Sequence, residues 1–216
     1  MSTTTQARQQ ILAKIHAITQ PDGGQAQSYA ALPRPYIRRG KLTSEACLAL
    51  LIERLSEYDA EVVECAEDEL PFTVAKQLAG SGRHVFAALA GLPAEWLTKG
   101  FEWLVDNGLS HAEIEHAEGV VTAAFCAVAD SGTIVLHHSA AEGRRVLTLL
   151  PDWHLCILRA SQVVETLPEY FDRCEEPATL ATYISGPSAT ADIEMTRIKG
   201  VHGPRFLHVI LVRDES

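Results

Sequence analysis

The stretch YISGPSATADIEMTRIKGVHGPRFLHVILV, residues 183–212, decides the fold, because it holds two strand-like pieces on either side of a polar segment. Tyr183 and Ile184 form the first piece, which a Ser-Gly-Pro-Ser turn at 185–188 ends. The apolar run 207–212 predicts the second. α/β domains commonly bind ligands in the loops that follow strands. We therefore expect an α/β domain with a ligand site in the polar segment.

The composition is that of an ordinary globular protein with an acidic charge balance. Of its 216 residues, 47% are hydrophobic and 21% are charged, and the net charge of −10 disfavours nucleic acid and anionic membrane surfaces as partners. A neutral or basic protein partner, or a small anionic ligand in a local basic pocket, fits better. The chain has no apolar run of about 18 residues, and its N-terminus lacks the apolar core of a signal peptide. We expect no membrane span and a cytoplasmic protein.

The cysteines indicate neither a metal site nor a disulfide framework. No two of them have CxxC or CxC spacing, so the sequence predicts no zinc or iron–sulfur ligation and no cofactor in this chain. Two of them, Cys126 and Cys156, lie in apolar runs and are expected in the core. The full set is Cys47, Cys65, Cys126, Cys156 and Cys174.

Residues 1–43 are predicted to form an arm ahead of an α/β domain over 44–216. The arm begins with a helix over 5–19 and continues as a Pro-rich connector with a basic patch. A solvated connector is the favoured interpretation of the patch. The alternative is a clamp for an anion or an acidic partner, since arginine offers a bidentate fork. The helix face comprises Ile11, Leu12, Ile15 and Ile18, and the patch comprises Arg34, Arg38, Arg39 and Lys41.

Alternating helix and strand patterns after Ser44 predict βαβ units and a mostly parallel sheet, with antiparallel strands added to it. Ser44 is a candidate N-cap for the first of these helices. The apolar run 119–129 does not distinguish a helix from a strand. Predicted helices cover 44–55, 71–80, 161–174 and a segment from Pro93 through Leu104, and predicted strands cover 61–65, 84–89, 134–136, 144–150, 153–159 and 207–212.

Two polar motifs are candidate ligand sites. For Asp130-Ser131-Gly132-Thr133 a tight turn is favoured over an anion pocket, although apolar runs on both sides place the motif at the end of buried structure. The second motif covers 186–194. If Ser188 caps a helix that begins near Ala189, its free N–H groups would face an anion, and i, i+4 spacing would pair Ser188 with Asp192 and Thr190 with Glu194. A site and a purely structural role are equally supported there.

Histidine supplies further candidates for acid–base chemistry. His202 is favoured, because the glycines and the proline of GVHGP imply a constrained backbone that would hold its ring. The adjacent His137 and His138 rank second. His111 and His116 rank low, because their stretch is polar and predicted to be exposed. No nucleophile elbow, P-loop, dinucleotide fingerprint or zinc-protease motif is present, so no reaction is specified.

Three segments resemble the LUD-domain family, in particular its lactate-utilization protein C group. They are ADSGTIVL at 129–136, RVLTLLPDWHLCIL at 145–158 and ISGPSATADIEMTRIKGVHGPRFLHVILV at 184–212. The family's GPS-x-T-ADIE and GVHGP elements are matched residue for residue, and Ser131 replaces the more usual threonine while keeping the hydroxyl. The resemblance covers about 45–216.

The resemblance implies a NagB/RpiA/CoA-transferase-like α/β fold, which agrees with the mostly parallel sheet flanked by helices, the extra antiparallel strands and the N-terminal helical arm predicted above. It implies a role in the oxidation of L-lactate to pyruvate, beside iron–sulfur partner subunits that carry the clusters. Three functions remain open: an accessory, non-redox subunit that binds a small anion, a stand-alone enzyme acting on a phosphorylated or CoA-type ligand, and an interaction module that uses the basic arm. A homo-oligomer is a further expectation.

The predicted site combines both polar motifs with the GVHGP turn. No metal ligands are predicted. The predicted ligand-binding residues are Asp130, Ser131, Gly132, Thr133, Gly186, Pro187, Ser188, Thr190 and Gly203, the predicted catalytic residues are Asp192, Glu194 and His202, and the predicted anion or partner clamp is Arg34, Arg38 and Arg39.

Overall fold

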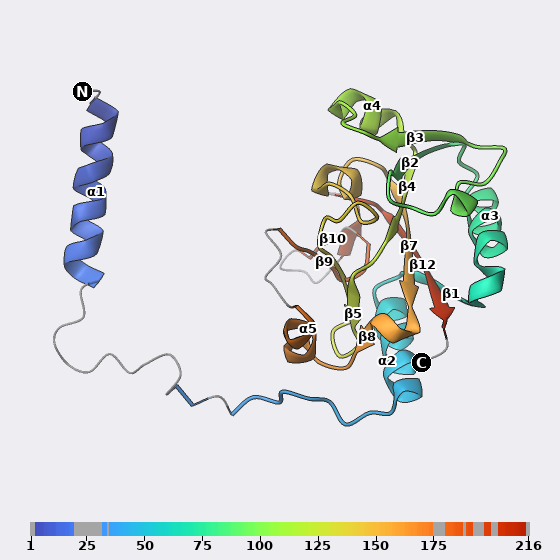
Figure 1. The fold of residues 1–216 in the computed structure, drawn as a ribbon, viewed down its shortest axis with the longest axis horizontal. Coiled ribbons are helices and arrows are strands. Elements are labelled where there is room, and N and C mark those ends of the chain that lie inside the picture. Colours follow the sequence, from blue (N-terminus) through green and yellow to red (C-terminus); the bar gives the residue numbers. More distant parts are fainter. Residues whose placement is uncertain are drawn as a thin grey trace. The chain divides into compact units, whose positions relative to one another are not determined.

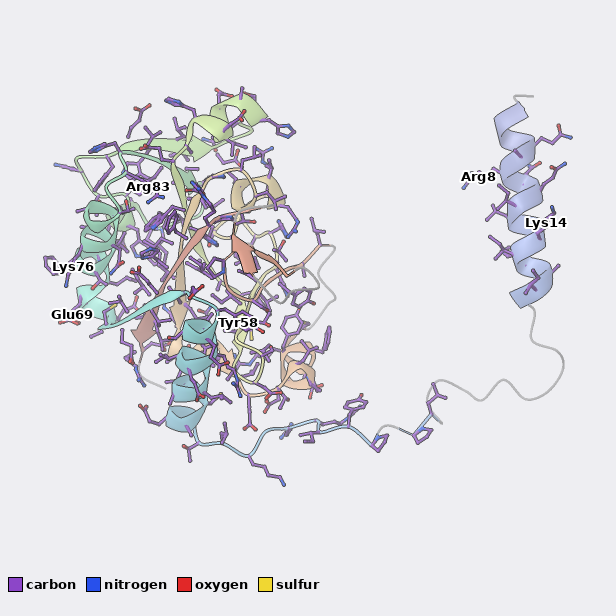
Figure 2. All side chains as sticks on the ribbon, turned by 180° about the vertical axis from the view of Figure 1, so that it is seen from behind. Arg8, Lys14, Tyr58, Glu69, Lys76 and Arg83 are labelled. Carbon is purple, nitrogen blue, oxygen red and sulfur yellow. The ribbon has the colours of Figure 1, made fainter. Side chains whose placement is uncertain are left out.

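The computed structural model divides the chain into two compact units, Met1–Tyr36 and Ile37–Ser216 (Figure 1). It describes residues 3–19, 32–33, 35–174, 180–187, 189–191, 197–199 and 203–214, with the backbone alone for 3–5, 19, 189–191 and 197–199. Within the first unit, α1 (Thr3–Thr19) confirms the predicted helix. Its apolar face is exposed, from 41% at Leu12 to 84% at Ile18, and Arg8 and Lys14 extend from the same helix (Figure 2).

The second unit is built on a six-stranded sheet whose strands are all parallel. The strand order is β1-β12-β7-β4-β2-β3, and the central β7 runs between β12 and β4. Strands covered on both faces are apolar throughout, which explains the unbroken runs in β7 and β12. The bounds are β1 Glu61–Ala66, β2 Val85–Leu89, β3 Glu102–Asp106, β4 Gly119–Ala123, β7 Trp153–Arg159 and β12 Phe206–Arg213.

Each face of this sheet carries its own core. On one face, Phe86 and Trp153 pack with α3 (Leu70–Gly80). On the other face, Cys156 and Leu158 pack with α2 (Ser44–Glu57) and with residues of a second sheet. Figure 1 shows α2 and α3 as separate helices beside the sheet. Alternate residues of β7 therefore belong to different cores.

The second sheet has four strands in the order β8-β5-β6-β9, and β6 pairs antiparallel with both neighbours. The ambiguous run 119–129 supplies strands to both sheets, because the chain leaves β4 at Ala123 and re-enters as β5 three residues later. The predicted antiparallel strands are thus present, mainly as a sheet of their own. The bounds are β5 Cys126–Val128, β6 Thr133–Leu136, β8 Val163–Val164 and β9 Thr182–Ile184, and a separate hairpin pairs β10 (Ala189–Ala191) with β11 (Arg197–Lys199).

The predicted helix from Pro93 through Leu104 is wrong. The segment forms a short 3-10 helix, η3 (Ala94–Trp96), and then strand β3. Gly100 adopts a φ of 99°, which no continuing helix allows, and the aromatic and branched residues after it pair with β2 in parallel register. Leu97, Phe101 and Leu104 still pack against the core, but from a turn and a strand.

The predicted strand 144–150 is also wrong, because the segment forms the 3-10 helix η4 (Arg145–Thr148). Both edges of β7 are already paired, so this neighbouring segment has no free edge there. Its backbone closes on itself instead, with the Leu147 amide donating to the Arg144 carbonyl at 2.9 Å. The Leu147 side chain is fully buried, so the apolar pattern reflects burial in a turn.

The segment 161–174 is not one helix. It holds the end of η5 (Ala160–Gln162), then β8, then helix α5 (Leu167–Arg173). Thr166 and Glu169 form a capping box, and Pro168 fits the first turn of α5, so the helix begins late. Two apolar residues of α5, Leu167 and Phe171, are 45% and 56% exposed.

Two further local predictions fail. α2 is capped by Thr43, whose hydroxyl accepts from the Ala46 amide, and Ser44 is its first residue. No helix begins at Ala189, because that residue starts β10, so the i, i+4 argument built on such a helix does not apply. The bounds of the remaining short elements are η2 Glu67–Glu69 and α4 His111–His116.

Candidate functional site

A pocket of about 150 Å³ lies on the α2 side of the six-stranded sheet, between β7, η4 and β9. Its lining comes from four different segments, three of which supply polar side chains, so the fold and not one motif assembles it. The lining residues are Arg145, Thr148, Leu149, His154, Thr182, Tyr183, Ile184, Ser185, Gly186, Pro187, Gly203, Pro204 and Leu207.

The pocket wall that belongs to the sheet carries a neutral, hydrogen-bonded histidine. His154 is the second residue of β7, and its Nε2 lies 2.8 Å from the Thr122 hydroxyl of neighbouring β4. The side chain is almost fully buried, and burial lowers the pKa of His154 to about 4. This ring is therefore uncharged near neutral pH and offers hydrogen bonding without charge.

The Thr182 hydroxyl is the hydrogen-bonding centre of the polar side of the pocket. Arg145 donates from Nη1 to the Thr182 hydroxyl at 2.9 Å, and the His138 Nε2 lies 2.8 Å from the same oxygen. Thr182 is buried and Arg145 is exposed, so a guanidinium at the mouth meets a hydroxyl held deeper in the pocket. Arg145 makes no ion pair within the described residues. This pair could bind a small anion whose carboxylate accepts from the Arg145 guanidinium and whose neighbouring oxygen forms a hydrogen bond with the Thr182 hydroxyl.

The backbone of His138 is in the left-handed region, with a φ of 59°, which is uncommon for a residue other than glycine. A buried carboxylate holds this turn, because the Glu142 side chain accepts from the His137 amide and from the Ser139 hydroxyl. The His138 Nδ1 is buried and has no hydrogen-bond partner in the described part of the chain. The turn thus fixes a ring that has one nitrogen on Thr182 and one nitrogen spare.

His137 points into an aromatic cluster next to this turn. Its ring stacks on Phe125 at 3.7 Å between centroids, and its Nε2 lies 2.9 Å from the Tyr170 hydroxyl. Tyr183, which lines the pocket, donates to the same hydroxyl at 3.3 Å. Burial lowers the pKa of His137 and raises that of Tyr170. The cluster is neutral near pH 7 and supports the wall behind Tyr183.

The predicted motif 130–133 forms the expected tight turn and lies outside the pocket. Asp130 and Ser131 are exposed, so no desolvation penalty argues for a ligand there. A hydroxyl chain nevertheless joins the first motif to Ser185, the residue before the second motif, with Ser131 to Thr133 at 2.8 Å and Thr133 to Ser185 at 2.7 Å. Ser185 lines the pocket. The motifs are therefore neighbours, but only the second contributes directly.

Glycines in both motifs are explained by the approach of α2. A Cβ at Gly132 (φ 61°) would lie 2.7 Å from the Cβ of Arg54, and one at Gly186 (φ 81°) would lie 2.4 Å from that of Tyr58. Figure 2 shows Tyr58 at the end of α2. Gly186 thus has a packing role and also lines the pocket, together with the predicted Pro187 and Gly203.

Several predicted site residues lie outside the described residues, namely Arg34, Ser188, Asp192, Glu194 and His202. Thr190 belongs to β10, where only the backbone is described. In sequence, 188–202 joins two residues that line the pocket, Pro187 and Gly203. Arg38 and Arg39 are exposed and are not part of the pocket. Their clamp role stays a prediction.

Sequence reasoning missed Arg145, Thr182 and His154. Arg145 was interpreted as part of a strand, Thr182 belongs to no motif, and His154 is one polar residue in an apolar strand. A polar residue inside an otherwise apolar strand was the available signal for His154, since such a residue needs a buried partner. Nothing local marks the other two, because the fold brings them together.

The described residues contain no group of three or more His, Cys, Asp or Glu side chains arranged to hold a metal ion. All five cysteines are free thiols, and four of them are buried. Burial raises the pKa of Cys126 to about 11 and that of Cys156 to about 12, so these thiols stay protonated near neutral pH. Within the same residues, no helix is both long and apolar enough to cross a membrane.

Comparison with known proteins agrees with this fold and extends over most of the chain. The LUD domain model matches residues 48–212. Lactate utilization protein C of Deinococcus radiodurans is 42% identical over 186 residues, which cover 84% of this chain and 86% of that protein. The protein of the same name from Bacillus subtilis is 35% identical over 135 residues, which cover 57% of this chain and about half of that protein, 55%.

A solved structure is similar as well. The crystal structure of a DUF162 family protein from Deinococcus radiodurans has a TM-score of 0.66 and 36% sequence identity, and the match covers 80% of this chain and 99% of that one. The LUD domain match over residues 48–212 contains all the segments that line the pocket. The chain belongs to the LUD-domain family, and its relatives there include proteins named lactate utilization protein C.

Proposed function

We propose that this protein serves lactate utilization as a non-redox subunit whose pocket binds a small organic anion. The names of its relatives support the lactate part of the proposal. The observation that carries the anion part is the pairing of Arg145 with Thr182 at a small pocket. A carboxylate would accept from the guanidinium, and the nearby hydroxyls would hold a neighbouring oxygen.

Pocket size supports a small ligand. The volume of about 150 Å³ is the size of a cavity that holds one benzene ring. Nucleotide or CoA-type ligands need several times that volume. L-lactate and pyruvate, each with a carboxylate and one further oxygen, fit in both size and polarity. This disfavours the alternative enzyme that acts on a phosphorylated or CoA-type ligand at this site.

The redox chemistry of lactate oxidation is assigned to partner subunits. The described cysteines are free thiols, and none belongs to a group of three or more described His, Cys, Asp or Glu side chains that could hold a metal ion. Burial raises the pKa of Cys47 and Cys156, so these thiols stay protonated near neutral pH. Iron–sulfur clusters require several thiolates at one place. We propose that iron–sulfur subunits of the same system carry the electrons, and that this chain binds or positions the anion for them. A cytoplasmic location and a homo-oligomer remain predictions.

The first test is genetic. Deletion of the gene from its source organism should abolish growth on L-lactate but not on glucose, and the wild-type gene should restore it. An Arg145→Gln variant should fail to restore growth, because the pocket loses its cation. Arg144→Gln is the matched control, since the neighbouring arginine pairs with Asp106 instead of lining the pocket. Normal growth of the deletion strain on lactate would refute the proposed role.

The second test concerns partners. Affinity-tagged protein purified from lactate-grown cells should carry along proteins with the visible absorption of iron–sulfur clusters near 400 nm. The Arg144→Gln and Arg145→Gln variants should co-purify equally, because neither residue is assigned to partner binding. Purification of the wild-type protein with no cluster-containing partner, from cells that grow on lactate, would contradict the subunit role and leave anion binding to be judged by titration.

A further inference from the structure

Thr182 holds a position from which it could distinguish ligands by the atom next to the carboxylate. Its hydroxyl oxygen accepts from Arg145 at 2.9 Å, and its side chain lines the pocket. A carboxylate bound by the outer face of the guanidinium would therefore place its α-carbon substituent near this hydroxyl. A hydroxyl group can donate one hydrogen bond while it accepts two.

His138 decides where the Thr182 proton points. If the His138 Nε2 carries hydrogen, the Thr182 oxygen accepts from both His138 and Arg145, and its own hydrogen is free to donate into the pocket. If Nε2 carries no hydrogen, Thr182 donates to it and has none left for a ligand. The rigid turn at His138, held by Glu142, keeps the ring on Thr182 in both cases.

We infer that Thr182 is the specificity-determining residue of the pocket and reads the α-oxygen of a 2-hydroxy or 2-oxo carboxylate, with His138 as the positioning residue that orients it. The inference rests on the proposed anion-binding function and adds the residues that distinguish these anions from simple carboxylates. Simple carboxylates such as propionate use Arg145 alone. Lactate and pyruvate use Arg145 and Thr182 together. A site built to hydrogen-bond an oxygen disfavours the analogue that lacks it, because its polar group is then left unpaired.

The test is a ratio of affinities, measured by isothermal titration of L-lactate, pyruvate and propionate into the full-length protein. The wild-type protein should bind lactate and pyruvate about tenfold more tightly than propionate. Thr182→Val keeps the shape but removes the hydroxyl, so the ratio should fall to about one. Thr182→Ser keeps the hydroxyl and should keep the ratio. Thr73→Val, a buried threonine on α3 and remote from the pocket, controls for the loss of a buried hydroxyl.

His138 variants separate orientation from packing. Asparagine tolerates the left-handed backbone and keeps a polar side chain, whereas alanine keeps neither advantage. His138→Ala should lower the lactate-to-propionate ratio several-fold, and His138→Asn should recover part of it. A merely structural role would change the melting temperature and the affinity for all three ligands alike, with no change in the ratio. If Thr182→Val does not fold, the His138 variants still test whether the oriented Thr182 hydroxyl distinguishes lactate from propionate.

The outcomes distinguish this inference from the proposed function. Equal affinity of the wild-type protein for lactate and propionate, with Arg145→Gln weakening both, would overturn the role of Thr182 while the anion pocket stands. An unchanged ratio in Thr182→Val would do the same. If the wild-type protein binds none of the three carboxylates, the proposed function falls and this inference falls with it.

Discussion

The two faces of strand β7 differ in what their alternate residues do. Trp153, Leu155 and Ile157 pack into the hydrophobic core that contains α3. His154, the residue after Trp153, faces the other side, where it forms a hydrogen bond with Thr122 and lines the pocket. One strand thus supplies a purely structural face and a face with chemistry. The comparison teaches that stability and ligand binding can be perturbed separately, residue by residue.

The largest effect is expected on the structural face. Trp153→Ala removes a fully buried ring that packs against Phe86 at 5.7 Å, and should lower the free energy of unfolding by about 3–5 kcal/mol. Urea denaturation measures this. Phe72→Ala is the control, because that ring is 74% exposed and its loss should change stability by less than about 0.5 kcal/mol. Similar losses in both variants would contradict the assigned core.

On the pocket face, protonation of His154 should lower the stability of the fold at acidic pH. Burial lowers the pKa of His154 from 6.5 to about 4, so the unfolded chain takes up this proton first as the pH falls. The stabilisation that comes from keeping His154 neutral is fully present above about pH 6.5. As the pH falls from about 6.5 to 4, the free energy of unfolding therefore decreases by roughly 3 kcal/mol. Urea denaturation at several pH values measures the slope, which should be shallower in His154→Gln. Parallel pH profiles for the two proteins would show that His154 is not buried as described.

A smaller loss of stability is expected from Arg144→Gln, which removes an ion pair next to the pocket residue Arg145. Arg144 binds Asp106 through two hydrogen bonds of 2.8 and 2.7 Å and lowers the pKa of that carboxyl. The ion pair stabilises the folded state above pH 3.8, the ordinary pKa of an aspartate. This stabilisation is lost as the pH falls through the lowered pKa of Asp106 in the folded protein. Arg144→Gln should cost about 1–2 kcal/mol, because Arg144 is exposed to solvent while the Asp106 side chain is only 6% exposed. Thermal melts at pH 7 and pH 3 measure it, with a smaller difference between variant and wild type expected at pH 3.

The same comparison explains which parts of the fold the sequence could predict. The apolar runs at β7 and β12 are typical of strands buried on both faces of a parallel sheet, and both strands were predicted correctly. Residues 93–104, 144–150 and 161–174 were not, because their apolar side chains are buried by turns and short strands without helical or alternating spacing. Only the surrounding structure decides whether such a segment has an edge to pair with.

The site was predictable in part for a similar reason. The Ser-Gly-Pro turn is marked by residues with restricted backbones, and Gly186 and Pro187 do line the pocket. Arg145 and Thr182 lie 37 positions apart and are brought together by the tertiary fold. The hydroxyl contact between Thr133 and Ser185, 52 positions apart, joins the first predicted motif to the residue before the second by the same route. Tertiary contacts of this kind leave no local pattern in the sequence.

The central claim is that Arg145 at this pocket binds a small organic anion. Isothermal titration of L-lactate into the wild-type protein and into Arg145→Gln, at the same pH and salt, tests it most directly. We predict saturable one-to-one binding by the wild-type protein and at least tenfold weaker binding by Arg145→Gln, with unchanged melting temperatures in the absence of ligand. Equal affinities in the two proteins, or no binding by either, would contradict the claim.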